Sequence, residues 1–373
     1  MNPEKFLQQE TSDIMSSILQ SIRQGKRKMV FFGAGRMAKT FINTYCVEKQ
    51  LLPVPAYICD SNQKLWGGNL SGAPIVPPEE LKKEAVEDTI IVMAQVLPFT
   101  MLNSLQTTYE DGGLQRYYHF MMPLSQLEAF LFYRENCGRV HRVYEALSDD
   151  RSRYAYKKYF QYLMEGNLTF PTIFTGNAYW GNDLTEGLRD GEVVVYAGAY
   201  DGKHLDRALR SNPNVELHGF EPNKNCAALL ERKYCNFPNV HIHKFGLGDK
   251  TQELYFDNTI GDSAMTVSET ERPERYYDTV EIEPMDRVLT GKVDLIALDI
   301  EGDEIKALQG AKRIIRENRP VLAICVYHRM EHYVEVAETI QKICPEYKFY
   351  FRQHSIVPHE SVLYAIYGGN DHG

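Results

Sequence analysis

The sequence predicts an α/β protein built from two doubly wound domains that a helical region joins. Short apolar segments rich in Val and Ile alternate with stretches of helical periodicity in residues 25–120, and the same alternation returns from residue 191 onward. Such alternation is typical of parallel sheets covered by helices. Residues 124–165 instead repeat apolar side chains at helical spacing only. Because 373 residues suffice for two cores, we expect domains with the boundaries 1–123, 124–170 and 171–373.

The first domain has the order of a mononucleotide-binding unit. An apolar strand at residues 28–32 runs into a turn with Gly33 and Gly35, and the next strand, at 56–59, ends on Asp60. In such units the glycines let the backbone approach phosphates and the acidic residue meets ribose hydroxyls, so we expect a Rossmann-like domain with these three residues as a second nucleotide site. An inert scaffold or a homodimer surface fits the same pattern. The other elements expected here are a helix and a strand, at residues 11–24 and 89–93.

The second domain is expected to contain a further series of strands, at residues 192–196, 215–220, 240–243, 293–298, 321–326, 348–351 and 362–366. The glycine-containing loop 197–202 follows the first of them, and Glu221 follows the second. A glycine loop, with an acidic strand end about 20 residues downstream, is typical of a nucleoside site. The segment 245–249 after the third strand either borders the purine ring or forms a plain turn.

An acidic block follows the fourth strand of this domain. The apolar residues 295–298 are succeeded by Asp299, Glu301 and Glu304, and a helical pattern begins at Ile305. Ligands bind at the carboxyl ends of strands in open α/β sheets, so carboxylates there are well placed for chemistry. Acidic residues also cap helix N-termini, and that alternative stays open for each of the three.

Taken together, these motifs resemble the FkbM-type methyltransferases over residues 145–367. The segments that carry the resemblance occur in the family's order and are Ala197 to Gly202, 220–222, 246–249, 262–264, 299–304, 319–320, 326–328 and 361–365. The block after the fourth strand is the family's hallmark. Where the family usually has Lys in the preceding strand, this chain has Ala297, a departure that affects the acceptor side rather than the donor side.

The resemblance implies a class I methyltransferase fold and transfer of a methyl group from S-adenosylmethionine to a hydroxyl of a sugar or another small natural product. Asp299 or His328 would take the hydroxyl proton, and Asp299 would alternatively cap a helix or contact the donor. The expected donor-binding residues are Ala197, Gly198, Ala199, Asp201, Glu221, Pro222, Gly248, Asp249, Ser263 and Glu301. The rival hypotheses are a nucleotide-dependent oxidoreductase or sugar-nucleotide-binding protein that uses the N-terminal site, and a non-catalytic binding protein.

Composition indicates which class of partner the protein binds and in which compartment it resides. A formal net charge of −9 without long basic runs argues against nucleic acid, which leaves a small molecule or glycan as the acceptor. The seven cysteines are scattered and form no pair at metal-binding or redox spacing, as expected in a reducing compartment. No signal peptide and no apolar run of membrane-spanning length is evident. We therefore expect a cytoplasmic protein without a membrane span, and a homodimer is compatible with the sequence.

Several patterns point to other chemistry, and we prefer the structural alternative for each. His328 to His332 matches an inverted zinc-protease motif, but His328 is expected at a strand exit rather than on a helix. Asp299 with Glu301 offers oxygen ligands for magnesium, although nothing else in the sequence demands a metal, and none is expected. His241 and His243 share a strand face, where packing is the commoner role.

Overall fold

The structure is a computed structural model that describes residues 9–85, 88–94, 121–165, 174–257, 266–267, 277–355 and 359–368. Its contacts divide the chain into two compact units. The first comprises residues 1–137 and 160–168, and the second comprises residues 138–159 and 169–373. The two long helices α4 (Leu124–Ala146) and α5 (Asp150–Glu165) each contribute residues to both units. Among the described residues, no helix combines the length and the apolar character needed to cross a membrane.

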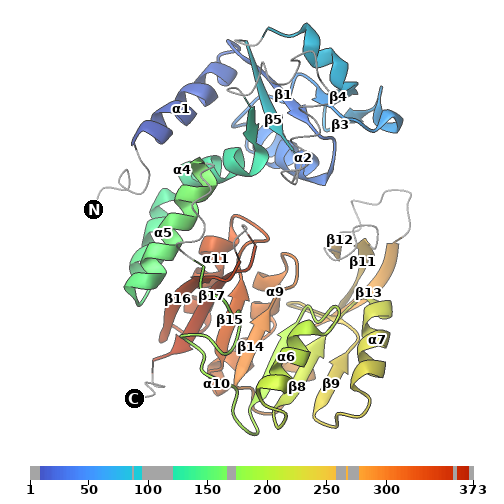
Figure 1. Cartoon of the computed structure of the whole chain (residues 1–373), viewed down its shortest axis with the longest axis vertical. Helices are drawn as coiled ribbons and strands as arrows, with labels where there is room; N and C mark the ends of the chain where they lie inside the picture. The colour runs from blue at the N-terminus through green and yellow to red at the C-terminus, as the bar shows by residue number, and fades with distance from the viewer. Residues whose placement is uncertain are drawn as a thin grey trace. The chain divides into compact units, whose positions relative to one another are not determined.

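The first unit contains a mostly parallel sheet, in the strand order β3-β4-β2-β1-β5-β6 within the described residues (Figure 1). Every neighbouring pair is parallel except β3 with β4. The central strands β1 and β5 are almost fully buried, which explains their continuous apolar sequence. The bounds of the strands are β1 Lys28–Phe32, β2 Ile58–Cys59, β3 Asn69–Leu70, β4 Ala73–Val76, β5 Thr89–Met93 and β6 Met121–Pro123.

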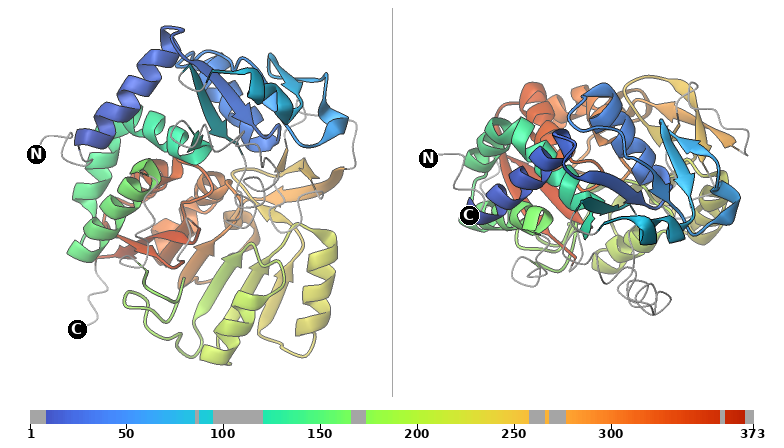
Figure 2. Two further views of the ribbon diagram at one scale, coloured as in Figure 1. Left: turned by 45° about the horizontal axis from the view of Figure 1, so that its top comes forward. Right: turned by 90° about the horizontal axis from the view of Figure 1, so that it is seen from above.

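Helices and turns of several kinds connect these strands (Figure 2). Helix α1 (Gln9–Arg23) buries Met15, Leu19 and Ile22, which are spaced four and three residues apart and so lie on one helix face. Helix α2 (Arg36–Phe41) follows the glycine turn, and a π-helical segment η2 (Ile42–Glu48) continues it. Two short 3₁₀ segments complete the described part of this unit, η3 Gln63–Leu65 and η4 Pro78–Lys83.

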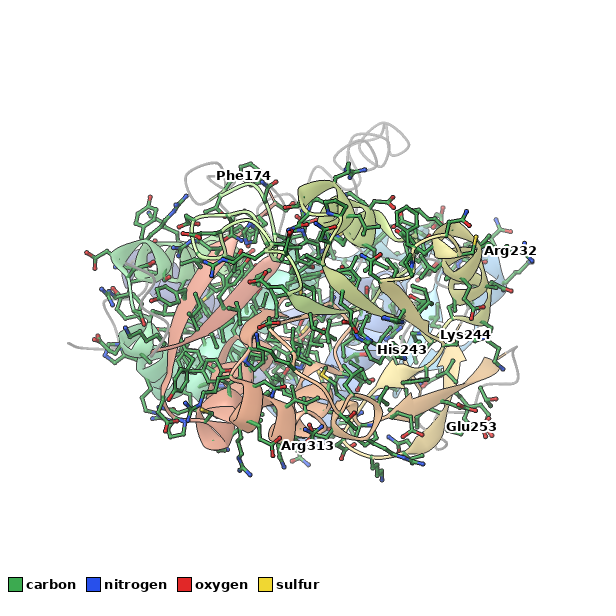
Figure 3. The ribbon with its side chains drawn as sticks, turned by 90° about the horizontal axis from the view of Figure 1, so that it is seen from below. Phe174, Arg232, His243, Lys244, Glu253 and Arg313 are labelled. Carbon is green, nitrogen blue, oxygen red and sulfur yellow. The ribbon has the colours of Figure 1, made fainter. Side chains whose placement is uncertain are left out.

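The second unit is built on a larger sheet with the strand order β16-β17-β15-β14-β7-β8-β9. The strands from β9 to β15 in this order are parallel, whereas β17 is antiparallel to both β15 and β16. Figure 3 shows the structure from below and labels His243, the last residue of β9. The bounds of the strands are β7 Val193–Ala197, β8 Glu216–Phe220, β9 Val240–His243, β14 Leu295–Leu298, β15 Val321–Cys325, β16 Tyr347–Gln353 and β17 Ser361–Tyr367.

Helices α6 and α7 pack on one face of this sheet (Figure 1). Leu205 of α6 and Leu230 of α7 share a buried cluster with Val194, Leu217 and Leu295 from the strands. Because side chains alternate across a strand, the residues next to these in sequence point to the opposite face. The helices of this unit are α6 Lys203–Ser211, α7 Lys224–Tyr234, α8 Met285–Val288, α9 Glu304–Gln309, α10 Lys312–Asn318 and α11 His332–Ile343.

The order of strands in the second unit creates a topological switch point. From β7 the chain proceeds through β8 to β9 on one side, and it later returns to place β14 and then β15 on the other side. Ligands of doubly wound sheets bind outside the carboxyl ends of the strands at such a point. The fold class is therefore confirmed as a mixed α/β architecture with mainly parallel sheets, and its ligand site is expected beside β7 and β14.

The sequence did not predict a small second sheet, in the order β10-β13-β11-β12, that follows β9. Among the described side chains, its strands pack only a few apolar ones together, including Leu254, Val280 and Ile282. Residues 252–283 therefore lack the dense apolar runs by which the other strands were recognised. The strands are β10 Gly246–Leu247, β11 Gln252–Asp257, β12 Thr266–Val267 and β13 Tyr277–Glu283.

Candidate functional site

The loop after β7 forms the first wall of the site. Strand β7 ends at Ala197, and the chain turns at Gly198, whose φ of 91° favours glycine. A Cβ atom at this position would collide with the carbonyl oxygen of Asp299, which follows β14. Gly202 has a φ of 78° and precedes α6 as its N-cap. Glycine is thus needed where the loops after β7 and β14 touch.

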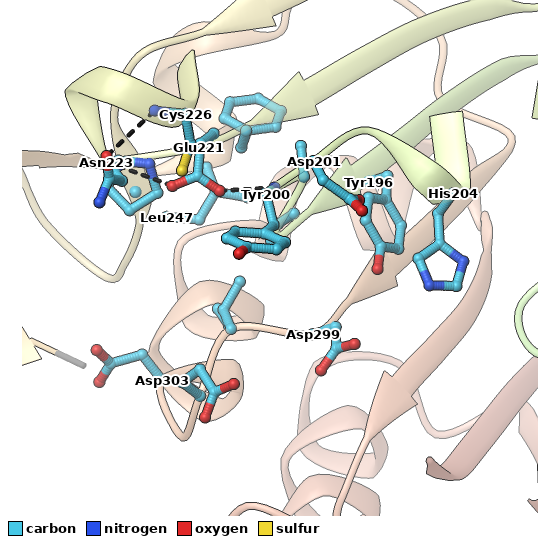
Figure 4. Close-up of a pocket in the computed structure, with 18 of the residues that line it drawn as sticks. Tyr196, Tyr200, Asp201, His204, Glu221, Asn223, Cys226, Leu247, Asp299 and Asp303 are labelled. Atoms are coloured by element: carbon cyan, nitrogen blue, oxygen red, sulfur yellow. Dashed lines mark hydrogen bonds between the residues drawn. The ribbon is translucent and has the colours of Figure 1, made fainter. Parts of the chain in front are cut away.

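Glu221, at the end of β8, ties two loops together. Its Oε2 accepts a 2.7 Å hydrogen bond from the backbone N–H of Tyr200, and its Oε1 accepts a 2.8 Å bond from the N–H of Asn223 (Figure 4). The side chain is buried, and burial raises the pKa of Glu221 although the two amide bonds oppose the rise. The carboxylate is therefore held in one orientation by the backbone on either side of it.

A cavity of about 530 Å³ lies at the carboxyl ends of β7, β8 and β14 (Figure 4). Pro222, Leu247 and Ile282 give it an apolar section, and Glu221 and Asp299 are among its carboxylates. The other lining residues come mostly from the loops after the three strands and from the start of α6 and α7: Tyr196, Ala197, Gly198, Ala199, Tyr200, Asp201, Lys203, His204, Phe220, Asn223, Asn225, Cys226, Gly246, Ile300, Glu301, Asp303 and Tyr327.

Asp299 is held by two tyrosine hydroxyls. Tyr179 Oη donates to its Oδ2 at 2.8 Å, and Tyr327 Oη donates to its Oδ1 at 3.0 Å. The backbone N–H of Tyr179 in turn donates to the hydroxyl of Tyr364 in β17 at 3.0 Å. Burial opposes ionisation of Asp299, but the neighbouring His328 and the bond from Tyr179 outweigh it and lower the pKa of this carboxyl. Asp299 is therefore an ionised, oriented carboxylate at the cavity wall.

His328 lies between two carboxylates. Its Nε2 is 3.3 Å from Oδ1 of Asp299, and its Nδ1 is 2.7 Å from Oε1 of Glu304. Burial disfavours the imidazolium, but the hydrogen bonds and charges of Asp299 and Glu304 outweigh burial and raise the pKa of His328 to about 10. His332 Nδ1 lies 3.1 Å from the other Glu304 oxygen, and the two histidines lower the pKa of Glu304 against the effect of its burial. At neutral pH His328 is consequently a cation rather than a base.

The structure brings most of the residues expected at the donor site to one cavity. The lining includes Ala197, Gly198, Ala199, Asp201, Glu221, Pro222 and Glu301. Gly248 and Asp249 are not part of it: Asp249 is exposed, and a Cβ on Gly248 would press against Ile282. Their role at the donor site therefore stays a prediction without support from the cavity. Ser263 lies outside the described residues.

Sequence reasoning did not find the partners that orient Asp299. Tyr327 stands at the exit of β15, next to the strand that carries Asp299, so the parallel pairing of β14 and β15 could have revealed it. Tyr179 gave no such signal, because it lies 120 residues upstream in an irregular segment. His328 precedes α11, which begins at His332, so the two histidines of the zinc-protease motif do not share one helix; both approach Glu304.

The residues expected at a second nucleotide site form an arrangement like that of Glu221. Asp60 Oδ2 accepts a 2.7 Å bond from the N–H of Ala34, and its Oδ1 accepts a 2.8 Å bond from the N–H of Asn62. Gly33 has a φ of 105°, and Gly35 is the N-cap of α2. Each unit thus links the loop after its first central strand to an acidic residue after the neighbouring strand.

Comparison with known proteins agrees with this geometry. The solved structure of methyltransferase FkbM from Methylobacillus flagellatus KT resembles this chain with a TM-score of 0.58 and 18% identity, over 97% of this chain and 98% of that one. At that identity the likeness establishes the fold alone. No curated protein matches the sequence.

Two further solved structures resemble about half of the chain. One is precorrin-6y C5,15-methyltransferase from Geobacter metallireducens GS-15, with a TM-score of 0.31, 12% identity and coverage of 48% of this chain and 82% of that one. The other is Aeropyrum pernix fibrillarin in complex with S-adenosyl-L-methionine, with a TM-score of 0.32, 12% identity and coverage of 49% and 70%. Such low TM-scores carry no weight here. The model of the methyltransferase FkbM domain, however, matches residues 197–352, and this part of the chain is therefore a methyltransferase domain of the FkbM family.

Proposed function

We propose that the protein transfers a methyl group from S-adenosylmethionine to a hydroxyl group of a sugar or another small molecule. The observation that carries the proposal is the cavity at the switch point of the second sheet, where Glu221 and an ionised Asp299 line one space with the glycine loop. Reaction and acceptor class both go beyond membership of the family, and each is open to a direct test.

The cavity suits a donor of this chemistry in size, shape and charge. Its volume of about 530 Å³ is within the range of small-molecule sites, roughly 300–1,000 Å³. The apolar section can hold a purine ring, and Glu221 lies where ribose hydroxyls bind in doubly wound sheets. Among the described residues, five carboxylates and one lysine line the cavity, namely Asp201, Glu221, Asp299, Glu301, Asp303 and Lys203. This excess of negative charge favours a sulfonium cation.

Asp299 has the position and the charge state of the group that takes the acceptor's proton. S-adenosylmethionine, when bound, supplies an electrophilic methyl group on a sulfonium. An acceptor hydroxyl that donates a hydrogen bond to Asp299 would pass its proton to the carboxylate as the new C–O bond forms and the bond from the methyl carbon to sulfur breaks, which leaves S-adenosylhomocysteine. Such assistance typically contributes about 10²–10⁴-fold. Tyr179 and Tyr327 hold the carboxylate, and His328 keeps it ionised. His328, already a cation at neutral pH, is a positioning residue rather than the base.

The proposal is tested by comparing Asp299→Asn with a matched change at the other end of β14. Asp294 precedes that strand and its Oδ2 accepts a 3.0 Å bond from the N–H of Val193, away from the cavity lining. We expect Asp299→Asn to lose methyl transfer from labelled S-adenosylmethionine to a panel of sugars, while calorimetry shows S-adenosylhomocysteine still bound. Asp294→Asn should retain both properties. An Asp299→Asn protein with undiminished transfer would refute the role of this carboxylate, and a wild-type protein that binds no S-adenosylhomocysteine would refute the activity.

A second candidate function is binding of a nucleotide or nucleotide sugar by the first unit. It is favoured by the hydrogen bonds that Asp60 accepts from the N–H groups of Ala34 and Asn62. Ligands that bind the folded state raise the melting temperature, and the rise grows with the logarithm of the ratio of ligand concentration to Kd. Stabilisation by NAD or a nucleotide sugar, lost in Asp60→Asn, would support this function. Stabilisation by S-adenosylmethionine, but not by NAD or a nucleotide sugar, would contradict nucleotide binding by the first unit.

A further inference from the structure

A group of metal-ligand side chains lies on β8 and β9. Glu216 and His218 are two residues apart on β8, and so they share one face of the strand. His218 is the register partner of His241 in β9, which places the three side chains side by side. One ligand atom from each of Glu216, His218 and His241 lies within 4.8 Å of the other two. The three residues form what we call the β8–β9 cluster.

The β8–β9 cluster is accessible from solvent. Leu217, Val240 and Ile242, which alternate with its residues, pack in the core beneath α6 and α7. The cluster therefore lies on the sheet face opposite these helices. The side chains of Glu216 and His241 are 48% and 43% exposed, so a metal ion can reach them without any rearrangement of the fold.

The spacing of the ligand atoms fits a tetrahedral metal ion. Bonds of about 2.0–2.1 Å to histidine nitrogen and carboxylate oxygen place tetrahedral ligands about 3.3 Å from one another. In the β8–β9 cluster, Oε1 of Glu216 lies 3.2 Å from Nε2 of His218 and 3.6 Å from Nε2 of His241. Two imidazole nitrogens thus converge on one carboxylate oxygen at about the edge length of a metal-centred tetrahedron.

A third histidine, His243, supports one of these ligands from behind. Nδ1 of His218 lies 3.0 Å from Nε2 of His243, and the two rings are stacked at an interplanar angle of 16°. His243 is itself stacked on Phe220, with ring centroids 4.3 Å apart. Histidine ligands in metal sites usually bond through their second nitrogen to a partner that fixes the ring. His243 fills that place and directs Nε2 of His218 toward Glu216.

We propose that Glu216, His218 and His241 bind a Zn²⁺ ion. Two histidines and one carboxylate form a ligand set that zinc accepts, with a fourth position left for water. The ion would link β8 to β9, the last strand on its side of the sheet, and so stabilise that edge. The sequence led us to expect no metal, because positions 216, 218 and 241 match no metal-binding spacing and only the pairing of the strands unites them.

Calorimetry of the untagged, metal-free full chain with ZnCl₂ tests the site directly. We expect one equivalent of Zn²⁺ to bind with a Kd in the micromolar range or below, and Glu216→Gln and His241→Gln to weaken binding at least tenfold. His141→Gln is the matched control, because Nε2 of His141 also lies 3.6 Å from a glutamate oxygen, that of Glu145, but belongs to no metal-ligand group among the described residues. Its binding should equal that of the wild type.

The coordination sphere provides a second readout. Co²⁺ bound in place of Zn²⁺ should give visible absorption bands that disappear in His241→Gln and persist in His141→Gln. Circular dichroism of each variant establishes that it is folded, which is expected because the substituted side chains of the cluster are half exposed. Absence of saturable binding at one equivalent would overturn the proposal, and so would undiminished binding in folded Glu216→Gln and His241→Gln.

Discussion

The hydroxyl of Tyr179 donates a 2.8 Å hydrogen bond to Oδ2 of Asp299, although the two residues are 120 positions apart in the sequence. Tyr179 is buried in the core of the second unit, whereas Asp299 faces the cavity. The bond therefore joins the packing of the sheet to the orientation of the carboxylate that we propose as the proton acceptor. Its removal should affect turnover more than folding.

Tyr179→Phe should lower kcat for methyl transfer at least tenfold. The lost bond is one to a charged group, worth about 1.5–3 kcal/mol, and 1.4 kcal/mol corresponds to a factor of ten in rate. Tyr156→Phe is the control, since its buried hydroxyl donates at 2.9 Å to the carbonyl of Tyr333, outside the cavity lining. Urea denaturation should show that both variants are folded, but only the first should turn over slowly. Equal kcat values for Tyr179→Phe and Tyr156→Phe would show that the bond from Tyr179 to Asp299 does not matter for methyl transfer.

Glu221→Gln should weaken binding of S-adenosylhomocysteine at least tenfold. Both carboxylate oxygens accept backbone N–H groups, and an amide NH₂ would meet one of those donors with another donor. The loop that carries Tyr200 would then lose its anchor. Glu192→Gln replaces a carboxylate that likewise accepts a backbone N–H, from Arg189 at 2.9 Å, but lies outside the cavity lining. Calorimetry should find its affinity unchanged, and a similar loss in both variants would contradict the expectation.

Gly198→Ala should abolish donor binding, whereas Gly191→Ala should not. Both glycines have positive φ, 91° and 74°, so alanine costs each about 1–2 kcal/mol of backbone strain. Only at Gly198 would the new Cβ collide with the carbonyl of Asp299, because no described residue other than its chain neighbours lies within 4 Å of a Cβ on Gly191. Melting temperatures and donor affinities of the two variants separate strain from collision. Full affinity in Gly198→Ala would mean that the two loops can move apart.

Stability between pH 6.5 and 10 should depend on His328. The pKa of its imidazole rises from 6.5 to about 10 on folding, so its contribution is fully present below pH 6.5 and is lost as the pH rises through 10. In urea denaturation, the free energy of unfolding should fall more steeply over this range in the wild type than in His328→Gln. His354→Gln should keep the wild-type slope, because burial lowers the pKa of His354 to about 4 and its titration lies at lower pH. Parallel curves for the wild type and His328→Gln would refute the ion pair.

The sequence was a good guide to the larger sheets. Strands such as Lys28–Phe32 and Thr89–Met93 have the expected bounds, because buried parallel strands are continuous apolar runs bounded by turns. The start of β14 was expected at Val293, but the strand begins at Leu295. Strands of the small sheet escaped notice because few of their described side chains are buried, and residues 252–283 contain no dense apolar run.

The parts of the candidate site that follow the end of a strand could be predicted from the sequence. Gly198 and Glu221 follow predicted strands directly, and both line the cavity. Contacts that depend on how distant segments pack could not be predicted from the sequence. Examples are the contact of Tyr179 with Asp299 and that of His332 with Glu304. Local spacing records the periodicity of one element, and it holds no information on which irregular segment will cover the end of a sheet.

The position of β17 has a consequence for the order in which the protein matures. This strand follows β16 in the chain yet lies between β16 and β15, and its Tyr364 holds the backbone of Tyr179. A nascent chain that has been made only as far as β16 therefore lacks the strand that lies between β15 and β16. It also lacks Tyr364, which accepts the hydrogen bond from the backbone of Tyr179. The residues that line the cavity, from Tyr196 to Tyr327, are all made before β16 and β17. During synthesis, a domain able to recognise the donor would thus precede one able to orient Asp299 for transfer.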